Sequence, residues 1–197
     1  MQSTRSWRMG AVAAVLLLAA CSSGSSGTQA AAPGPATPSA ARVISVATLK
    51  PGQTVPTPAG KALFTMTGKI STSNKGADLV FDQSTVEDLG LVQVKLYEPW
   101  TKADMEFRGV WLKDLVAVAG VPADATRLHI TALDDYAVDL SLADIRAGGI
   151  MLATRAGDGS AIPIDQGGPS RVVFSDGVKA GTNADQWVWS VKEIAVQ

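Results

Sequence analysis

The sequence predicts an α+β domain that is rich in strands, with short helices between them. Segments that alternate between apolar and polar residues recur along the chain, separated by turn residues. The few segments with helical periodicity are short and do not alternate regularly with the strands, as they would in a parallel βαβ fold. About 155 residues follow the N-terminal segment, which is the size of one ordinary domain.

The first twenty residues have the composition of a secretory signal. Arg5 and Arg8 give a charged start, and the apolar run MGAVAAVLLLAA is too short to span a bilayer as a helix. The run ends in LAAC, which resembles the cleavage box of bacterial lipoproteins, whose cysteine is acylated, for example with palmitate. We therefore expect residues 1–20 to be a lipoprotein signal peptide and Cys21 to carry a membrane anchor. An ordinary signal peptide cleaved near Ala20 is the alternative.

The next segment predicts a tether. Residues 21–41 are small, uncharged after the cysteine, and rich in Gly, Ser, Ala and Pro, so they cannot bury a core. We expect this segment to hold the domain at 42–197 away from the membrane, on the extracytoplasmic face of the cell envelope, in the periplasm or at the cell surface. No later stretch of sequence is apolar enough to cross a bilayer.

The first elements of the domain follow in order. LFTMTGKI alternates and predicts a strand at 63–70. STVEDLG has the capping-box spacing from Ser84 to Glu87, which predicts one short helical turn. LVQVKLYE predicts a strand at 91–98, with one face formed by Val92, Val94 and Leu96 and the other by Gln93, Lys95 and Tyr97. GVWLKDLVAVAG predicts a helix at 109–120 with an apolar stripe of Leu112, Leu115, Val116 and Ala119.

The second half continues the mixed pattern. Strands are predicted at 127–133 and 136–140 around an Asp134-Asp135 turn, followed by a short helix over 141–149. Gly157-Asp158-Gly159 is a hairpin signal between predicted strands at 150–156 and 161–165. The last two strands are predicted at 171–175 and 186–196; Trp187 and Trp189 would share one face of the latter and pack in the core.

Composition limits the chemistry of the domain. Cys21 is the only cysteine, so the domain has no disulfide, no cysteine nucleophile and no thiolate metal ligand. His129 is the only histidine, which excludes zinc sites built on several imidazoles, and its place in a strand favours a structural or surface role. Loss of Arg5 and Arg8 with the signal would leave 15 basic against 18 acidic side chains, a net charge of −3. This balance argues against a nucleic-acid partner.

Four segments in order resemble the molybdopterin-binding domain of the sulfite oxidase family. They are YEPWT followed by FRGVWLKDLV, then DDYAVDLSLAD, then MLATRAGDGSAIPIDQGGPSRVVF, and finally WVWSVKEI. The resemblance covers about residues 60–197 and implies the strand-rich fold of that family. It also implies a molybdenum cofactor held by a pterin dithiolene and one protein cysteine.

The resemblance places Leu96 where the family has its metal-binding cysteine. A leucine offers no lone pair to a metal, so we expect no cofactor, with molybdopterin as the alternative. The turn Asp165-Gln166-Gly167-Gly168-Pro169 also lacks the histidine that sulfite oxidases have there.

The same resemblance outlines a candidate pocket. Tyr136 falls where the family has an active-site tyrosine, and Arg171 where it has an anion-contacting arginine. Glu98, Trp100 and Gln166 complete the set. Four of these residues also have a structural interpretation: Trp100 and Tyr136 in packing, Arg171 as a solvated strand end, and Glu98 paired with a backbone N–H or an arginine.

Three functions remain open from the sequence. The first is a lipid-anchored, non-catalytic binding or accessory protein whose pocket holds a small anionic ligand or a protein partner. The second is a molybdopterin-dependent oxidoreductase that acts on a small sulfur oxyanion or sulfoxide. The third is a structural envelope lipoprotein whose pocket has collapsed.

Overall fold

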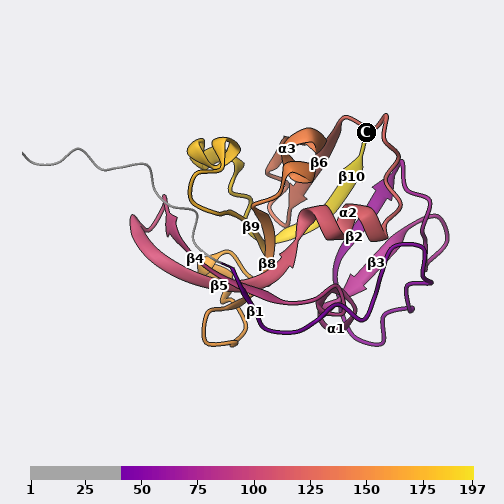
Figure 1. The fold of residues 1–197 in the computed structure, drawn as a ribbon, viewed down its shortest axis with the longest axis horizontal. Helices are drawn as coiled ribbons and strands as arrows, with labels where there is room; N and C mark the ends of the chain where they lie inside the picture. Colours follow the sequence, from indigo (N-terminus) through magenta and orange to yellow (C-terminus); the bar gives the residue numbers. More distant parts are fainter. Residues whose placement is uncertain (1–40) are drawn as a thin grey trace, which may run out of the picture. The chain divides into compact units, whose positions relative to one another are not determined.

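Two five-stranded sheets form the core of the computed structural model, which describes residues 41–197. The first sheet has the order β1-β4-β5-β8-β9, and all of its neighbouring strands are antiparallel. Its strands are β1 (Arg42–Val43), β4 (Val92–Glu98), β5 (Ala103–Trp111), β8 (Ile150–Ala156) and β9 (Arg171–Phe174). β4 and β5 form a long curved hairpin (Figure 1).

The second sheet has the order β3-β2-β10-β6-β7. Its strands are β2 (Ala62–Gly68), β3 (Leu79–Asp82), β6 (Arg127–Ala132), β7 (Ala137–Ser141) and β10 (Val191–Val196). β10 runs parallel to β2 and antiparallel to β6, so the C-terminal strand joins the early and middle parts of the chain.

Short helices connect the strands. The α-helices are α1 (Gln83–Glu87), α2 (Leu112–Val118) and α3 (Leu142–Ala147), and the 3₁₀ turns are η1 (Ile164–Gln166), η2 (Lys179–Thr182) and η3 (Ala184–Gln186). The predicted α+β class with many strands is therefore confirmed. None of the helices within residues 41–197 is long and apolar enough to span a membrane.

The apolar patterns predicted for β4 and α2 lie where they were expected. On β4, Val94 and Leu96 are buried, whereas Lys95 and Tyr97 on the other face are exposed. The helix predicted at 109–120 is shorter, because β5 continues to Trp111 and α2 ends at Val118. Its predicted stripe is nevertheless buried: Leu112, Leu115, Val116 and the C-cap Ala119. Ser141 caps α3 by accepting a hydrogen bond from the Ala143 N–H.

Some predicted elements were wrong in their bounds or type. α1 is capped by Asp82 rather than Ser84, because the Asp82 carboxylate accepts the Thr85 N–H. The segment after the 157–159 turn is not a strand: the carbonyl of Pro163 accepts the N–H groups of Gln166 and Gly168 and closes η1. β9 pairs with β8 in its place.

The last strand is shorter than predicted and excludes both tryptophans. β10 begins at Val191, and the preceding Ser190 has φ 51°, a left-handed conformation that interrupts an extended chain. Trp187 is buried, as expected, and Trp189 is half-buried in the connecting segment. Strands β3 and β5 and the short β1 were not predicted.

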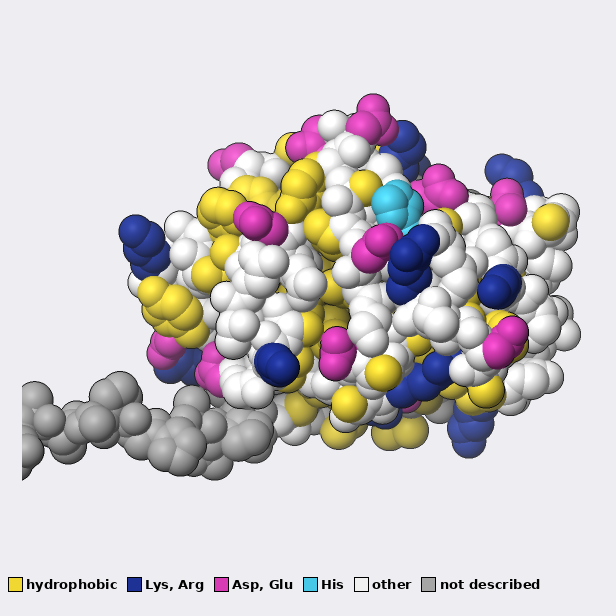
Figure 2. Space-filling model, turned by 90° about the horizontal axis from the view of Figure 1, so that it is seen from above, with side chains coloured by type: hydrophobic (Ala, Val, Ile, Leu, Met, Phe, Trp, Pro, Cys, Tyr) yellow, Lys and Arg dark blue, Asp and Glu magenta, His cyan; other side chains and the backbone are white. Residues whose placement is uncertain are grey.

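The predicted signal peptide and the acylation site at Cys21 lie outside the described residues, as does nearly all of the predicted tether. On the face in Figure 2, acidic and basic side chains are interspersed rather than gathered into one charged patch.

Candidate binding site

A buried ion pair lies at the centre of the candidate site. Arg171, the first residue of β9, donates from Nη2 to Oε1 of Glu98, the last residue of β4, over 2.6 Å. The two side chains are 1% and 0% exposed. The remaining polar atoms are partly satisfied: Glu98 Oε2 accepts the Thr101 N–H at 2.6 Å, and Arg171 Nη1 donates to the Gln166 carbonyl at 2.9 Å.

Aromatic rings enclose the guanidinium. The Cζ atom of Arg171 lies 4.6 Å from the ring centroid of Trp189 and 5.2 Å from that of Phe107. Burial lowers the pKa of Arg171, and the hydrogen bond and charge of Glu98 oppose that shift. Three buried polar groups in this region have no hydrogen-bond partner among the described residues: Arg171 Nε, Ser170 Oγ and Trp189 Nε1.

This arrangement changes the role that the sequence suggested for Arg171. A solvated strand end is excluded, because the side chain is fully buried. An oxyanion could contact the guanidinium only after the ion pair with Glu98 and the surrounding rings had moved. For Glu98, the structural interpretation holds, since it pairs with an arginine and with a local backbone N–H.

A pocket opens beside this pair. Its volume is about 360 Å³, within the range of small-molecule sites. We call it the aromatic pocket; its lining residues are Trp100, Ala132, Asp134, Tyr136, Ala184, Asp185, Trp187 and Trp189. Trp189 belongs to this lining and also contacts Arg171, so it separates the pocket from the ion pair.

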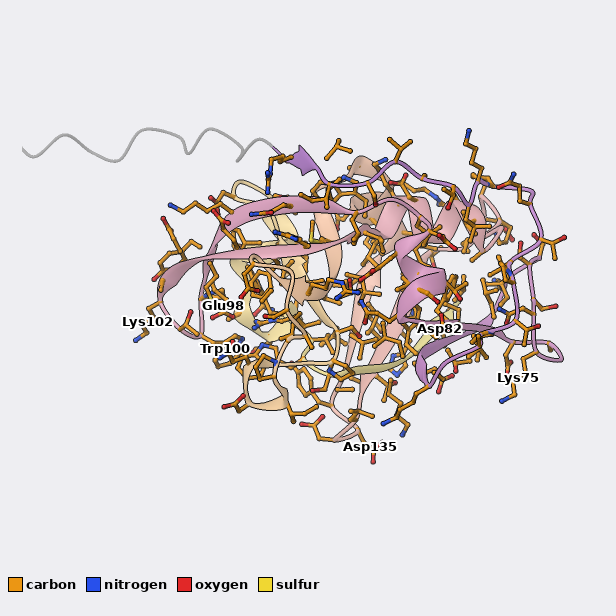
Figure 3. All side chains as sticks on the ribbon, turned by 90° about the horizontal axis from the view of Figure 1, so that it is seen from below. Lys75, Asp82, Glu98, Trp100, Lys102 and Asp135 are labelled. Atoms are coloured by element: carbon orange, nitrogen blue, oxygen red, sulfur yellow. The ribbon has the colours of Figure 1, made fainter. Side chains whose placement is uncertain are left out.

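The structure brings together some of the predicted site residues. Trp100 and Tyr136 line the aromatic pocket, while Glu98 and Arg171 lie buried behind it. Glu98 and Trp100 are at the same end of the molecule, at the turn of the β4–β5 hairpin (Figure 3). Gln166 takes part through its backbone carbonyl alone, and its side chain is exposed and not among the pocket residues.

Sequence reasoning missed the residues that complete the pocket. Trp189 was predicted to lie in the core, and no pocket role was predicted for Asp185. The signal that could have indicated these residues is the loop rich in Gly, Asp and Asn before the WVW motif. This loop forms two 3₁₀ turns, η2 and η3, which bring Asp185 beside Tyr136. His129 lies apart on β6, where its Nδ1 is 2.8 Å from Asp139 Oδ1.

The described residues do not fit a molybdenum centre held by a protein thiolate. Leu96, at the position that the resemblance assigns to the cysteine, is 1% exposed and belongs to the hydrophobic core. The aromatic pocket carries two aspartates and no Lys or Arg, which disfavours the phosphate of a pterin cofactor.

Comparisons with known proteins support the fold. A crystal structure of the sulfane dehydrogenase SoxCD from Paracoccus pantotrophus is similar, with a TM-score of 0.54 and 18% sequence identity. The likeness covers 68% of this chain but only 37% of that one, and at this identity it shows the fold alone. Comparison with curated protein sequences finds no significant match. The family model for the oxidoreductase molybdopterin binding domain matches residues 87–196, more than half of the sequence, so the chain belongs to that family.

Proposed function

We propose that this protein is a lipid-anchored binding or accessory protein of the cell envelope, and that its molybdopterin-binding-type domain serves recognition rather than redox catalysis. The proposal rests on two residues at the positions of the family's metal ligand and anion contact. Leu96 is sealed in the core, and the charge of Arg171 is neutralised inside the protein by Glu98. Neither residue is available to a metal or to an oxyanion.

The aromatic pocket supports a binding role. Trp100 is 54% exposed and Tyr136 44% exposed, although both are large apolar side chains at the mouth of a pocket. Exposed aromatic residues grouped around a concavity are typical of recognition sites. This open pocket disfavours a purely structural domain, in which the pocket would be filled by side chains.

The second candidate function is a molybdopterin-dependent oxidoreductase for a small sulfur oxyanion or sulfoxide. Membership of the oxidoreductase molybdopterin binding domain family favours it. In that case the pterin dithiolene and a non-protein ligand would have to hold the metal.

Metal and pterin analysis of the protein purified from its native host tests the proposal. We expect far less than one molybdenum atom and one pterin per chain, and no turnover of sulfite or of a sulfoxide. Near-equimolar molybdenum with bound pterin would overturn the non-catalytic role and establish the oxidoreductase.

A further inference from the structure

The aromatic pocket is lined by aromatic rings together with carboxylates. Four of its side chains are aromatic: Trp100, Tyr136, Trp187 and Trp189. It also carries two carboxylates, those of Asp134 and Asp185, and no Lys or Arg is among the lining residues. Aromatic faces carry negative partial charge, so a ring face and a carboxylate both favour a cation.

Contacts within the domain hold three of the four rings, those of Tyr136, Trp187 and Trp189, in place. The Tyr136 hydroxyl donates to the Asp185 carbonyl at 2.6 Å. The Trp187 indole N–H donates to the Gly181 carbonyl at 3.0 Å, and its ring packs against Phe174 at a centroid distance of 5.4 Å. Rings that are fixed before binding lose little conformational freedom when a ligand enters.

Trp189 is held from behind by the buried ion pair. Gly167 has φ +85°, and a Cβ there would lie 2.7 Å from the Cγ of Trp189, so a glycine is required for this close packing. The guanidinium of Arg171 already lies over the Trp189 ring. Because Glu98 pairs with the guanidinium at 2.6 Å, the net charge behind the ring is zero, which lowers the repulsion of a cation on the pocket side.

The two carboxylates complete the site. Asp134 is positioned by the Tyr136 N–H, which donates to its Oδ1 at 3.1 Å. Within the described part of the chain, neither Asp134 nor Asp185 forms an ion pair, whereas the neighbouring Asp135 pairs with Lys192. Both carboxylates are exposed at the rim, where they attract a cation from solution and repel an anion.

The geometry points to a ligand class: we propose that the aromatic pocket binds a small organic cation of the quaternary or tertiary alkylammonium type. Such a group is too bulky and too weakly hydrated to be held by a carboxylate alone, and it favours contact with several ring faces. The inference rests on the proposed binding function and specifies its ligand. It replaces the anionic ligand expected from the sequence, because the only arginine of the candidate site is buried in an ion pair.

A pair of isosteric probes tests the charge preference. Choline and its neutral carbon analogue, 3,3-dimethylbutan-1-ol, have the same shape and differ in charge. Isothermal titration of each into the mature lipoprotein, in a maltoside detergent that lacks a choline headgroup, gives the two dissociation constants. We expect choline to bind with a dissociation constant on the order of 1 mM or lower, and roughly tenfold more tightly than the alcohol. Equal affinity for the two probes, or no binding of choline, overturns the proposal.

Variants locate the binding site. Trp100→Ala should weaken choline binding roughly tenfold, and Asp134→Asn with Asp185→Asn should weaken it while leaving the alcohol unaffected. Tyr97→Ala is the matched control, because Tyr97 is 50% exposed but lies outside the aromatic pocket. If Tyr97→Ala and Trp100→Ala have the same effect, the cation does not bind at this pocket and the proposal fails.

The outcome is separable from the test of the proposed function. Near-stoichiometric molybdenum in the native protein would refute the non-catalytic role whatever choline does. Absence of choline binding in metal-free protein would refute the ligand class and leave the metal analysis standing.

Discussion

Arg171 and Glu98 are joined by a 2.6 Å ion pair although they are 73 positions apart in the sequence. They lie at the ends of β9 and β4, which are not neighbours in their sheet, since β5 and β8 run between them. The pair therefore links β4 across β5 and β8 to the edge strand β9, beneath the aromatic pocket. A charge pair without solvent contact is costly to form, and it is much more costly to leave one partner alone.

Removing either partner should destabilise the domain. We expect Arg171→Met to lower the free energy of unfolding by about 3–5 kcal/mol, because the Glu98 carboxylate would remain buried and unpaired. Urea unfolding followed by circular dichroism measures the change. The double variant Arg171→Met/Glu98→Leu should recover a large part of the loss, since neither charge remains. A single variant as stable as the wild type would show that the pair is not structural.

A loss of stability on removal of Arg171 is the opposite of what its assignment as a pocket residue predicts. With Arg171 as a pocket residue at a strand end, Arg171→Ala would abolish binding of an anion and leave the thermal midpoint nearly unchanged. The burial of the side chain between Phe107 and Trp189 makes a loss of stability the expected result. Residue identity alone could suggest that Arg171 is important, but not whether its charge faces solvent or Glu98.

Leu96 should behave as a core residue. Leu96→Ala should cost about 2–5 kcal/mol of unfolding free energy, the range for truncation of a buried leucine, as measured by urea unfolding. Leu96→Cys restores the side chain of the family's metal ligand, and we expect the purified variant to acquire no stoichiometric molybdenum. Its thiol should react slowly with a soluble disulfide reagent in the folded state and quickly in urea. Molybdenum loading of the cysteine variant would contradict this account and show that the pocket retains its cofactor site.

Local patterns in the sequence were sufficient for much of the fold. The alternation through Val94, Lys95 and Leu96 is a property of the strand itself, so the buried face of β4 was predictable. The stripe of α2 was predictable for the same reason. The N-cap of α1 was not predictable in this way. The capping-box spacing indicated Ser84, but the cap is Asp82, whose carboxylate also accepts the Gly60 N–H from a distant segment.

The candidate site depends on contacts that the sequence does not display. Trp187 and Trp189 are spaced like residues on one strand face, yet the left-handed Ser190 places them in a connecting segment. Tyr136 and Trp100 were matched to one cavity through a family resemblance, and they do line the same pocket. The closure of that pocket by Asp185 requires the fold of η3, which has no strong periodic signal.

Membrane attachment should depend on Cys21, which lies outside the described residues. Cys21→Ser removes the acylation site, so we expect the domain to be released into the soluble extracytoplasmic fraction or to accumulate as an uncleaved precursor. Metabolic labelling with a palmitate analogue, followed by membrane fractionation, measures both effects. Ser22→Ala is the matched control and should label normally. Membrane attachment that persists unchanged in Cys21→Ser would refute the lipoprotein assignment.

Asp82 should make the stability of the domain sensitive to acid. Asp82 is 3% exposed, and its carboxylate accepts hydrogen bonds from Thr85 Oγ1, the Thr85 N–H, the Gly60 N–H and Ser84 Oγ. These bonds, those from Thr85 foremost, hold the pKa of Asp82 far below its ordinary value of 3.8, although burial acts in the opposite direction. The folded state therefore favours the ionised form more strongly than the unfolded state does.

The sign of the pH dependence follows from this difference. Above pH 3.8 the contribution of Asp82 to the free energy of unfolding is present in full. Below pH 3.8 Asp82 is protonated in the unfolded chain but remains ionised in the folded chain, so the free energy of unfolding falls as the pH falls. Asp82→Asn should cost about 1.5–3 kcal/mol at about pH 6, because bonds to a charged acceptor are replaced by weaker ones. Its deficit relative to the wild type should shrink at about pH 3. Urea unfolding at the two pH values, with the exposed Asp124→Asn as control, measures this; a deficit that is constant with pH would show that Asp82 is not preferentially ionised in the folded state.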